Sequence, residues 1–438
     1  MKKIVSLILV IILCTGLFSC MPNLRKYAVK YADDPVEFDS VSLENEGFVA
    51  FINKINTFAI NMSDSLYKSG VDQVNFCISP ASIFISLATA CESANGETRD
   101  QILSALNITY DELIEYTSLY YSLCNKEFTY TNSYGAINVS AHERLVNSVW
   151  MSSDKEYKST GVNSITKNYY GNVFSASFKD NSAKKVINQY IEYISHNIIP
   201  GNVNISPDTE LSFISAYHLK EIWNEFGRTL NLSLESYDFI NEDQSSVTKQ
   251  LLKSPYTEGR VTNNTKYTSF HIDTEHKYRI YFMVPSKNYT LDEVFTPKNI
   301  SQVISITDHK FIDHVASLIH YTKILFPELD VSFSGDISKN LQEDFGIKYL
   351  FDAEKCDLSN LFVSDAHCNS FIHTSRLRLD AKGIEGETIN LGRSEKTPEE
   401  LPDYEIVYHD YIVNRDFGFI LTDPNGVILY IGRVNSLN

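Results

Sequence analysis

The residues that could take part in chemistry lie in one polar segment near the C-terminus, at 383–414. It contains Lys396-Thr397 and Arg393-Ser394, and a basic residue before a bond attracts a trypsin-like protease, whose specificity pocket carries an acid at its base. Thr397-Pro398 is a poor bond for cleavage because proline lacks a backbone N–H and restricts the backbone. We interpret the segment as a substrate-like loop, in which Lys396-Thr397 and Arg393-Ser394 are the candidate bonds for cleavage. The alternative is that both basic residues only keep a loop soluble.

The elements that must hold this loop are strands. The run from His373 to Leu379 precedes the loop, and apolar runs at 411–421 and 426–434 follow it around an Asp-Pro-Asn-Gly turn. These runs cluster and alternate like buried strands, so we expect the loop to be fixed at both ends.

No motif of a familiar enzyme class accompanies the loop. The chain has no Gly-x-Ser-x-Gly elbow, no His-Glu-x-x-His pair and no Gly-rich phosphate cradle before a helix. The eleven histidines are scattered. His271 and His276 are an odd number of residues apart on an expected strand, so they face opposite sides and do not share a metal. We expect no cofactor, no metal and no enzymatic activity.

The composition and patterning predict one large α+β domain at 47–438. The chain has 438 residues and 43% hydrophobic content, and no linker or repeat interrupts residues 47–390. Apolar residues recur at helical spacing in 48–62, 82–90 and 186–194. Aromatic and β-branched runs at 267–272 and 278–284 predict strands. Mixed helices and strands with distant segments paired in one sheet define the α+β class.

The N-terminus is predicted to be a targeting device outside the fold. Two lysines precede the apolar run 4–13, which is shorter than the roughly 20 residues of a membrane span. The run ends in Leu17-Phe-Ser-Cys20, which resembles a bacterial lipobox, so we expect residues 1–19 to be removed and Cys20 to carry lipid. Residues 20–46 are then a flexible tether. The alternative is an ordinary secretory signal, and on both interpretations the protein is extracytoplasmic, either anchored to a membrane or secreted.

Charge and cysteine content limit the partners. Removal of two lysines leaves 38 − 2 = 36 basic against 55 acidic residues, a balance of −19, which argues against nucleic acid and permits attraction to a basic enzyme. Five cysteines remain beyond Cys20, an odd number that indicates buried thiols rather than a disulfide framework. One bridge in the region of Cys356 and Cys368 stays open.

From residue 47 to the C-terminus the order of motifs resembles the serpin family. In chain order they are a strand-to-helix passage at 75–83, a Gly-x-Thr-x-x-Gln turn from Gly96, an Asn-x-x-Trp strand ending at Trp150, a strand from Ser215 to Phe226, Leu325-Phe-Pro327, Phe345-Gly346 and the C-terminal segments around the loop. The resemblance implies helices packed around a large central mixed sheet with smaller sheets, and an exposed reactive loop at about 383–413. It implies a monomeric inhibitor of a serine protease, or of a cysteine protease, that needs no cofactor.

The resemblance also implies a mechanism. A protease forms an acyl-enzyme on the loop, and the cut loop inserts as a new central strand and distorts the enzyme. The family's usual loop length counted from Gly383 ends near Lys396-Thr397-Pro398, which makes Lys396-Thr397 the favoured bond and Arg393-Ser394 the second choice. Alternate residues must face the core on insertion. They are Ile384, Gly386, Thr388 and Asn390, whereas Glu385, Glu387 and Ile389 face outward.

Some positions depart from the family pattern. His373 matches the histidine beneath the central sheet, with Ser79 and Ser82 as its neighbours, but Ser215 replaces an asparagine and predicts a weaker or water-bridged latch. Trp223 matches the tryptophan at the end where the sheet opens. In the loop, Ile384 is large, Asn390 needs a hydrogen-bond partner and Ala381 replaces an acid. The alternative function is therefore a non-inhibitory serpin-fold surface lipoprotein that acts as a binding or scaffold module.

Overall fold

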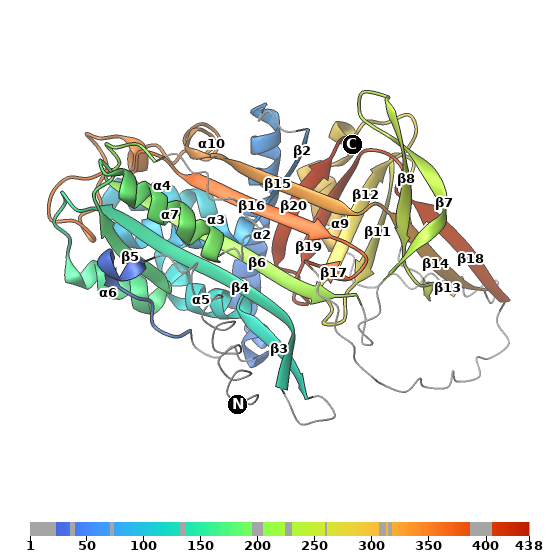
Figure 1. The fold of residues 1–438 in the computed structure, drawn as a ribbon, viewed down its shortest axis with the longest axis horizontal. Coiled ribbons are helices and arrows are strands. Elements are labelled where there is room, and N and C mark those ends of the chain that lie inside the picture. Colours follow the sequence, from blue (N-terminus) through green and yellow to red (C-terminus); the bar gives the residue numbers. More distant parts are fainter. Residues whose placement is uncertain are drawn as a thin grey trace, which may run out of the picture.

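The computed structural model describes residues 23–35, 40–70, 74–131, 137–194, 205–223, 230–258, 261–305, 312–313, 318–385 and 405–437 (Figure 1). Its helices are α2 (Glu46–Lys68), α3 (Pro80–Ser93), α4 (Gly96–Leu106), α5 (Tyr110–Leu123), α6 (Ser159–Asn168), α7 (Asn181–Ile194), α8 (Leu291–Val294), α9 (Pro297–Ile304) and α10 (Ser338–Glu343). Short 3-10 turns are η1 (Leu24–Lys26), η2 (Ser40–Glu44) and η3 (Tyr349–Phe351).

The strands form three sheets. The first has the order β1-β5-β4-β6-β17-β16-β15, with β3 added on β4. Its strands are β1 (Ala28–Lys30), β3 (Lys126–Thr131), β4 (Ile137–Ser152), β5 (Gly171–Ala176), β6 (Leu211–Ile222), β15 (Leu329–Asp336), β16 (Ile372–Leu379) and β17 (Gly383–Ile384).

The second sheet has the order β10-β11-β12-β19-β20-β2, and the third contains β13, β14, β8 and β7, with β18 and β9 paired to β14. The second consists of β2 (Asn75–Ile78), β10 (Val261–Asn263), β11 (Tyr267–Asp273), β12 (Arg279–Pro285), β19 (Phe417–Thr422) and β20 (Ile428–Val434). The third consists of β7 (Asn231–Ile240), β8 (Ser246–Lys253), β9 (Thr257–Glu258), β13 (Ile312–Asp313), β14 (Leu318–Phe326) and β18 (Glu405–Ile412).

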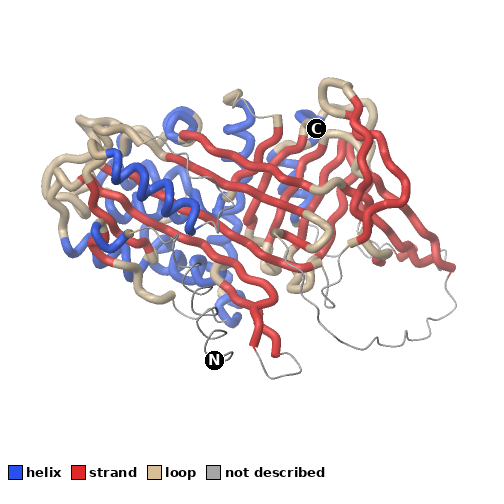
Figure 2. Tube along the Cα trace, in the orientation of Figure 1, coloured by secondary structure: helices blue, strands red, loops and turns tan. Residues whose placement is uncertain are grey.

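The first sheet has two faces, and different layers cover them. Helix α7 covers part of one face, where Ile187 and Tyr190 pack with Trp150 of β4 and Ile214 of β6. We call this the outer face. The other, the core face, packs on α3 and on the second sheet. Figure 2 shows most helices around one half of the first sheet and the other two sheets at its other half.

Local sequence explains the two helices under the core face. Asn45 begins α2 because its side chain accepts hydrogen bonds from the N–H groups of Gly47 and Phe48. Helix α3 starts with Pro80 at its first turn and is buried on nearly every side, as expected for a helix that is apolar all round. The predicted helices and strands at 48–62, 82–90, 186–194, 267–272 and 278–284 are confirmed by α2, α3, α7, β11 and β12.

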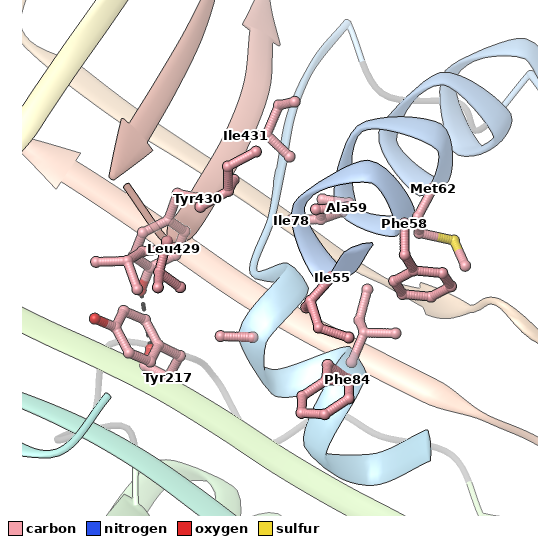
Figure 3. Close-up of a cluster of buried hydrophobic side chains, with 14 of the residues drawn as sticks. Ile55, Phe58, Ala59, Met62, Ile78, Phe84, Tyr217, Leu429, Tyr430 and Ile431 are labelled. Carbon is pink, nitrogen blue, oxygen red and sulfur yellow. Dashed lines mark hydrogen bonds between the residues drawn. The ribbon is translucent and has the colours of Figure 1, made fainter. Parts of the chain in front are cut away.

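The core joins α2 and α3 to the C-terminal hairpin (Figure 3). Ile55 of α2 lies beside Phe84 of α3, Phe58 lies next to Met62 on α2, and Leu429 and Ile431 of β20 lie on the other side of the cluster. One polar contact crosses this cluster, from the Tyr430 hydroxyl to the carbonyl oxygen of Tyr217 at 2.9 Å. The contact fixes β6 against the hairpin.

Two segments differ from the sequence-based expectations. Part of the expected tether is folded: β1 pairs with β5, and Tyr27 packs 6.5 Å from the ring of Trp150 because this segment has its own apolar side chains. On the far side of the expected loop, β18 is a strand parallel to β14. Its Ile406, Val407 and Tyr408 belong to the residue types that favour strands, so the loop is shorter than 383–413.

Candidate functional site

Strand β17 lies between β6 and β16 at one end of the first sheet (Figure 1). Gly383 and Ile384 pair with Ile222 and Glu221 of β6, and Ile384 also pairs with Leu379 of β16. Because β17 is antiparallel to both neighbours, β6 and β16 run parallel to each other. No ladder joins β6 directly to β16, and both strands lie wholly within the described ranges. Beyond β17 no described strand lies between β6 and β16, and these two strands come close to each other. We call the line between them, along which they would have to part to admit a further strand, the open strand position.

Gly383 has to be glycine at this point. Its φ is +156°, and a Cβ atom added there would lie 2.0 Å from the carbonyl oxygen of Glu221. Backbone atoms cannot move aside as a flexible side chain can. The absence of a side chain therefore lets β17 approach β6 closely enough to pair.

The two residues after Gly383 face opposite sides of the sheet. Ile384 is fully buried on the core face, so the bulky residue at the start of the loop has room. Glu385 lies on the outer face, because successive residues of a strand point to opposite sides of the sheet. Its side chain is nevertheless only 8% exposed. Its φ of +50° is left-handed, which ends the extended conformation after Ile384.

Glu385 contacts His218, which in turn contacts His142 on the next strand. Its Oε2 lies 2.7 Å from Nε2 of His218 on β6, and Nδ1 of His218 lies 2.8 Å from Nε2 of His142 on β4. Burial raises the pKa of Glu385 to about 8, an effect partly offset by Arg378 and Arg376. Burial lowers the pKa of His218 to about 4. Both shifts favour uncharged forms of the buried pair.

His373 lies beneath the sheet and ties β16 to the start of α3. Its Nε2 accepts a hydrogen bond from the backbone N–H of Ser79 at 3.2 Å. Burial alone lowers its pKa to about 3, so the ring is neutral. The hydroxyl of Ser82 donates to the carbonyl oxygen of Ser79 at 3.0 Å, which holds the same turn.

Ser215 ties β6 to α3 independently of His373. Its hydroxyl donates to the carbonyl oxygen of Ser82 at 2.8 Å and accepts from Ser86 at 2.9 Å. The structure gives no hydrogen bond between Ser215 and His373, although both residues are described. Each strand is thus anchored on α3, and these two side chains do not link the strands to each other.

Trp223 stands at the end of the open strand position. Its Nε1–H donates to the carbonyl oxygen of Asp380 at 2.7 Å, and its ring packs on Phe326 at 5.8 Å between centroids. The side chain is 4% exposed. Trp223 therefore connects the end of β6 to the turn that leads into β17.

Buried acids lie under the same end of the sheet. Glu221, which pairs with Ile384, has both carboxylate oxygens within 3.0 Å of Nδ1 of His276. His276 lies in the turn after β11 and not on a strand, because extended pairing ends at Asp273. Glu143 of β4 contacts the hydroxyl of Tyr278, and burial raises its pKa to about 8.

Several predicted site residues lie outside the described ranges. They are the proposed cleavage residues Arg393, Ser394, Lys396 and Thr397, the hinge residues Gly386, Thr388 and Asn390, and the lipidation residue Cys20. Of the predicted set, the structure brings together Gly383, Ile384 and Trp223 at one end of the open strand position, and Ser79, Ser82, Ser215 and His373 beneath its middle.

The described ranges also bear on the expectations for metal sites, disulfide bonds and membrane-spanning helices. They contain no group of three or more His, Cys, Asp or Glu side chains arranged to hold a metal ion. Cys77, Cys91, Cys124, Cys356 and Cys368 are all free thiols, so the bridge left open at Cys356 and Cys368 is not formed. None of the described helices combines the length and the apolar character of a membrane span.

Comparison with known proteins assigns the family. The family described as "Serpin (serine protease inhibitor)" matches residues 53–437, so the chain belongs to the serpin family. Alpha-1-antiproteinase F of Cavia porcellus is 24% identical over 394 residues, which cover 85% of this chain and 89% of that protein. A protein named "Probable non-inhibitory serpin-Z5" of Arabidopsis thaliana is 21% identical over 426 residues, with 90% and 86% covered.

The solved structures agree on the fold. The crystal structure of tengpin, a thermophilic serpin in its native state, superimposes with a TM-score of 0.70 at 18% identity and covers 95% of this chain and 99% of its own. The protein therefore has the serpin fold, with helices, several sheets and a large mixed central sheet. Serpins are in general protease inhibitors and not enzymes.

Sequence reasoning missed His142, His218 and the role of Glu385. Glu385 counted only as an outward residue of an insertable loop. A signal was present, because an acid directly after the hinge and a histidine on β6 are both unusual in segments that bury most side chains. The sequence alone does not align the two residues, since strand register decides which side chains meet.

Proposed function

We propose that this protein inhibits a serine protease, or a cysteine protease, by trapping the enzyme on a cleaved loop that then enters the open strand position. The observation that carries the proposal is β17. Gly383 and Ile384 already pair with β6, and Ile384 also with β16, in the antiparallel sense that an inserted strand requires. The start of the loop therefore sets the register in which the remaining loop residues would follow.

The outer face of the open strand position suits the acidic start of the loop. In the register of β17, residue 385 would lie between Lys220 of β6 and Arg378 of β16. Glu387 would lie between the next outer pair, His218 and Arg376. Both acids would thus enter between positively charged or titratable side chains, which supports insertion in this register.

The core face offers a partner for Asn390. The same register places residue 388 between Tyr217 and Ser375, and residue 390 between Ser215 and His373. An amide at 390 would then lie where it can hydrogen-bond both side chains, which do not bond each other before insertion. We infer that the loop itself supplies the amide that Ser215 lacks. The polar side chain at 390 then favours insertion instead of opposing it.

The chemistry begins with the target enzyme. Its nucleophile attacks the carbonyl carbon of Lys396, the bond to Thr397 breaks, and the enzyme stays attached as an acyl ester or thioester. Insertion then carries Lys396 and the attached enzyme along the sheet. Strain on the trapped enzyme separates its catalytic groups from its oxyanion hole, so water no longer completes hydrolysis. Arg393-Ser394 is the second candidate bond, with a shorter tether for insertion.

The proposed setting is outside the cytoplasm, with lipid on Cys20 as the membrane anchor. Removal of residues 1–19, attachment through Cys20 and a monomeric state complete this proposal. The folded part of the chain already begins within the expected tether, because η1 starts at Leu24 and β1 pairs with β5. The domain would therefore stand close to the membrane surface.

The test is to mix residues 22–438 with trypsin and look for a complex that survives SDS. We expect a complex near the summed masses that disappears in Thr388→Arg, because residue 388 would have to bury a charge between Tyr217 and Ser375. Glu400→Arg is the matched control, since it adds an arginine on the far side of the cleaved bond and should leave the complex intact. Persistence of the complex in Thr388→Arg would contradict insertion in this register.

The second candidate is a non-inhibitory binding or scaffold module, favoured by the relative named as a probable non-inhibitory serpin. The melting temperature of the protein cut in its loop separates the two functions. Insertion adds a central strand and should raise the melting temperature by tens of degrees. A fixed fold should keep or lose stability after the same cut.

A further inference from the structure

The contact between Glu385 and His218 is out of register with the strand that would insert. In the ladder started by β17, Glu385 should lie beside Lys220 and Arg378, because Ile384 pairs with Glu221 and Leu379. Its carboxyl group instead contacts His218, the neighbour of position 387. The left-handed φ of +50° at Glu385 accompanies this displacement. Both features have to be undone before the next residue can pair.

We propose that Glu385, held by His218 and His142, is a positioning residue that stops the loop after two paired residues and releases it when its carboxyl group ionises. This proposal rests on the proposed function, because it concerns the start of loop insertion. On release, Glu385 becomes extended and moves toward Lys220 and Arg378. The contact with His218, which we call the hinge latch, thus opposes insertion, and the two cations favour it.

The chemistry of the hinge latch is that of one buried acid and two imidazoles in a row. A protonated Glu385 can donate to Nε2 of His218, which lies 2.7 Å from its Oε2, and Nδ1–H of His218 can then donate to Nε2 of His142, so that the row carries no net charge. Ionised Glu385 leaves a charge that is only 8% exposed. The charged and titratable groups on the surrounding strands are His142 and Arg144 on β4, Lys220 on β6, Arg376 and Arg378 on β16, and Asp330 on β15.

The direction of the pH effect follows from the two shifts. The pKa of Glu385 in the latch is raised from 4.5 to about 8. Protonated Glu385 therefore stabilises the latch fully below pH 4.5, and this stabilisation is lost as pH rises through about 8. The pKa of His218 is lowered from 6.5 to about 4. Neutral His218 therefore stabilises the latch fully above pH 6.5, and this stabilisation is lost as pH falls through about 4. The two effects oppose each other between 4.5 and 6.5. The latch should therefore weaken mainly between pH 6.5 and 8, by up to about tenfold per pH unit.

The first measurement is the emission of Trp223 from pH 6 to 9 in residues 22–438. Trp223 bonds the turn before β17, and the only other tryptophan, Trp150, is buried under α7. We expect a one-proton transition near pH 8. Glu385→Gln keeps an uncharged side chain of the same shape and should hold the low-pH emission throughout, whereas Glu385→Ala should show the high-pH emission throughout.

The control for this titration is Glu143→Gln, because burial gives Glu143 a pKa of about 8 as well. This variant should keep the wild-type transition. A transition that persists in Glu385→Gln, or that is absent from the wild-type protein, would overturn the hinge latch.

The second measurement is the rate constant for trapping trypsin, determined for the wild-type protein and for Glu385→Ala at pH 6.5 and at pH 8.5. At each pH the wild-type rate constant is divided by that of the variant. The ratio cancels the pH dependence of the enzyme. We expect it to rise about tenfold, toward one, at the higher pH, and an unchanged ratio would contradict the latch. If no variant traps trypsin at either pH, the proposed function fails, and the emission of Trp223 still decides whether the latch exists.

Discussion

Three consecutive residues at the start of the loop have separate tasks. Gly383 allows the backbone to approach β6, Ile384 fixes β17 in the core, and Glu385 ends the pairing. Each task comes from a different property: the absence of Cβ, apolar volume and a titratable group. A substitution at one of the three therefore affects a different step.

Gly383→Ala tests the close approach. The added methyl group would meet the carbonyl oxygen of Glu221, so we expect a loss of about 1–3 kcal/mol in the free energy of unfolding, or displacement of β17. The measurement is urea denaturation together with the emission of Trp223. Gly346→Ala is the matched control, because Gly346 also has a positive φ but has open space around it, and it should cost only about 1 kcal/mol. Equal costs at the two glycines would contradict the close approach.

At the scale of elements, the important feature is how β6 and β16 are anchored. Ser215 fixes β6 to the carbonyl oxygen of Ser82, and His373 fixes β16 to the N–H of Ser79. Both anchors belong to the first turns of α3, while the strands share no ladder in the described ranges. Parting the strands therefore costs packing more than inter-strand hydrogen bonds.

Asn390→Ala tests whether the loop completes this arrangement after cleavage. The inserted amide would bond Ser215 and His373, so we expect the variant to destabilise the cleaved protein by about 1–2 kcal/mol and to leave the intact protein unchanged. Melting of both forms is the measurement. Thr397→Ala, beyond the cleaved bond, should affect neither form. Equal destabilisation of the intact and cleaved proteins by Asn390→Ala would contradict the register.

At the scale of the whole molecule, buried acids gather at the end of the first sheet where β17 lies. Glu143, Glu221 and Glu385 come from two strands and the loop, and burial raises the pKa of each of them. A raised pKa means that stability is complete below the unfolded value near 4.5 and is lost as pH rises through the folded value. The stability of the whole fold should thus fall from mildly acidic to mildly alkaline pH.

Glu143→Gln isolates one of these acids. Burial raises the pKa of Glu143 to about 8, so between about pH 4.5 and 8 the unfolded chain carries an ionised Glu143 while the folded protein keeps it protonated. The free energy of unfolding should therefore fall by on the order of 1 kcal/mol per pH unit in this range. We expect urea denaturation of the wild-type protein to show this decline between pH 6.5 and 8. In Glu143→Gln the slope of the free energy of unfolding against pH should be smaller by the contribution of one titrating group. Glu293→Gln, at the exposed start of α8, is the control and should leave the slope unchanged. The same slope in wild type and Glu143→Gln would contradict the assignment.

The sequence by itself determined the family and the main helices and strands. These features follow from local patterns, because helical and strand periods are read within a few consecutive residues. The order of short motifs added the serpin fold, which the family match and the solved structures confirm. The local patterns did not predict β18, because its residues directly follow a polar segment.

Only the tertiary structure decided which distant residues meet. The pairing of Ile384 with Glu221 fixes a register, and a shift of one residue would turn Glu385 away from the face that carries His218. The folding of the expected tether onto β5 likewise depends on an edge strand that the local sequence does not reveal. Register and burial arise from the packing of the whole chain, and they give Glu385 and the two histidines their altered surroundings.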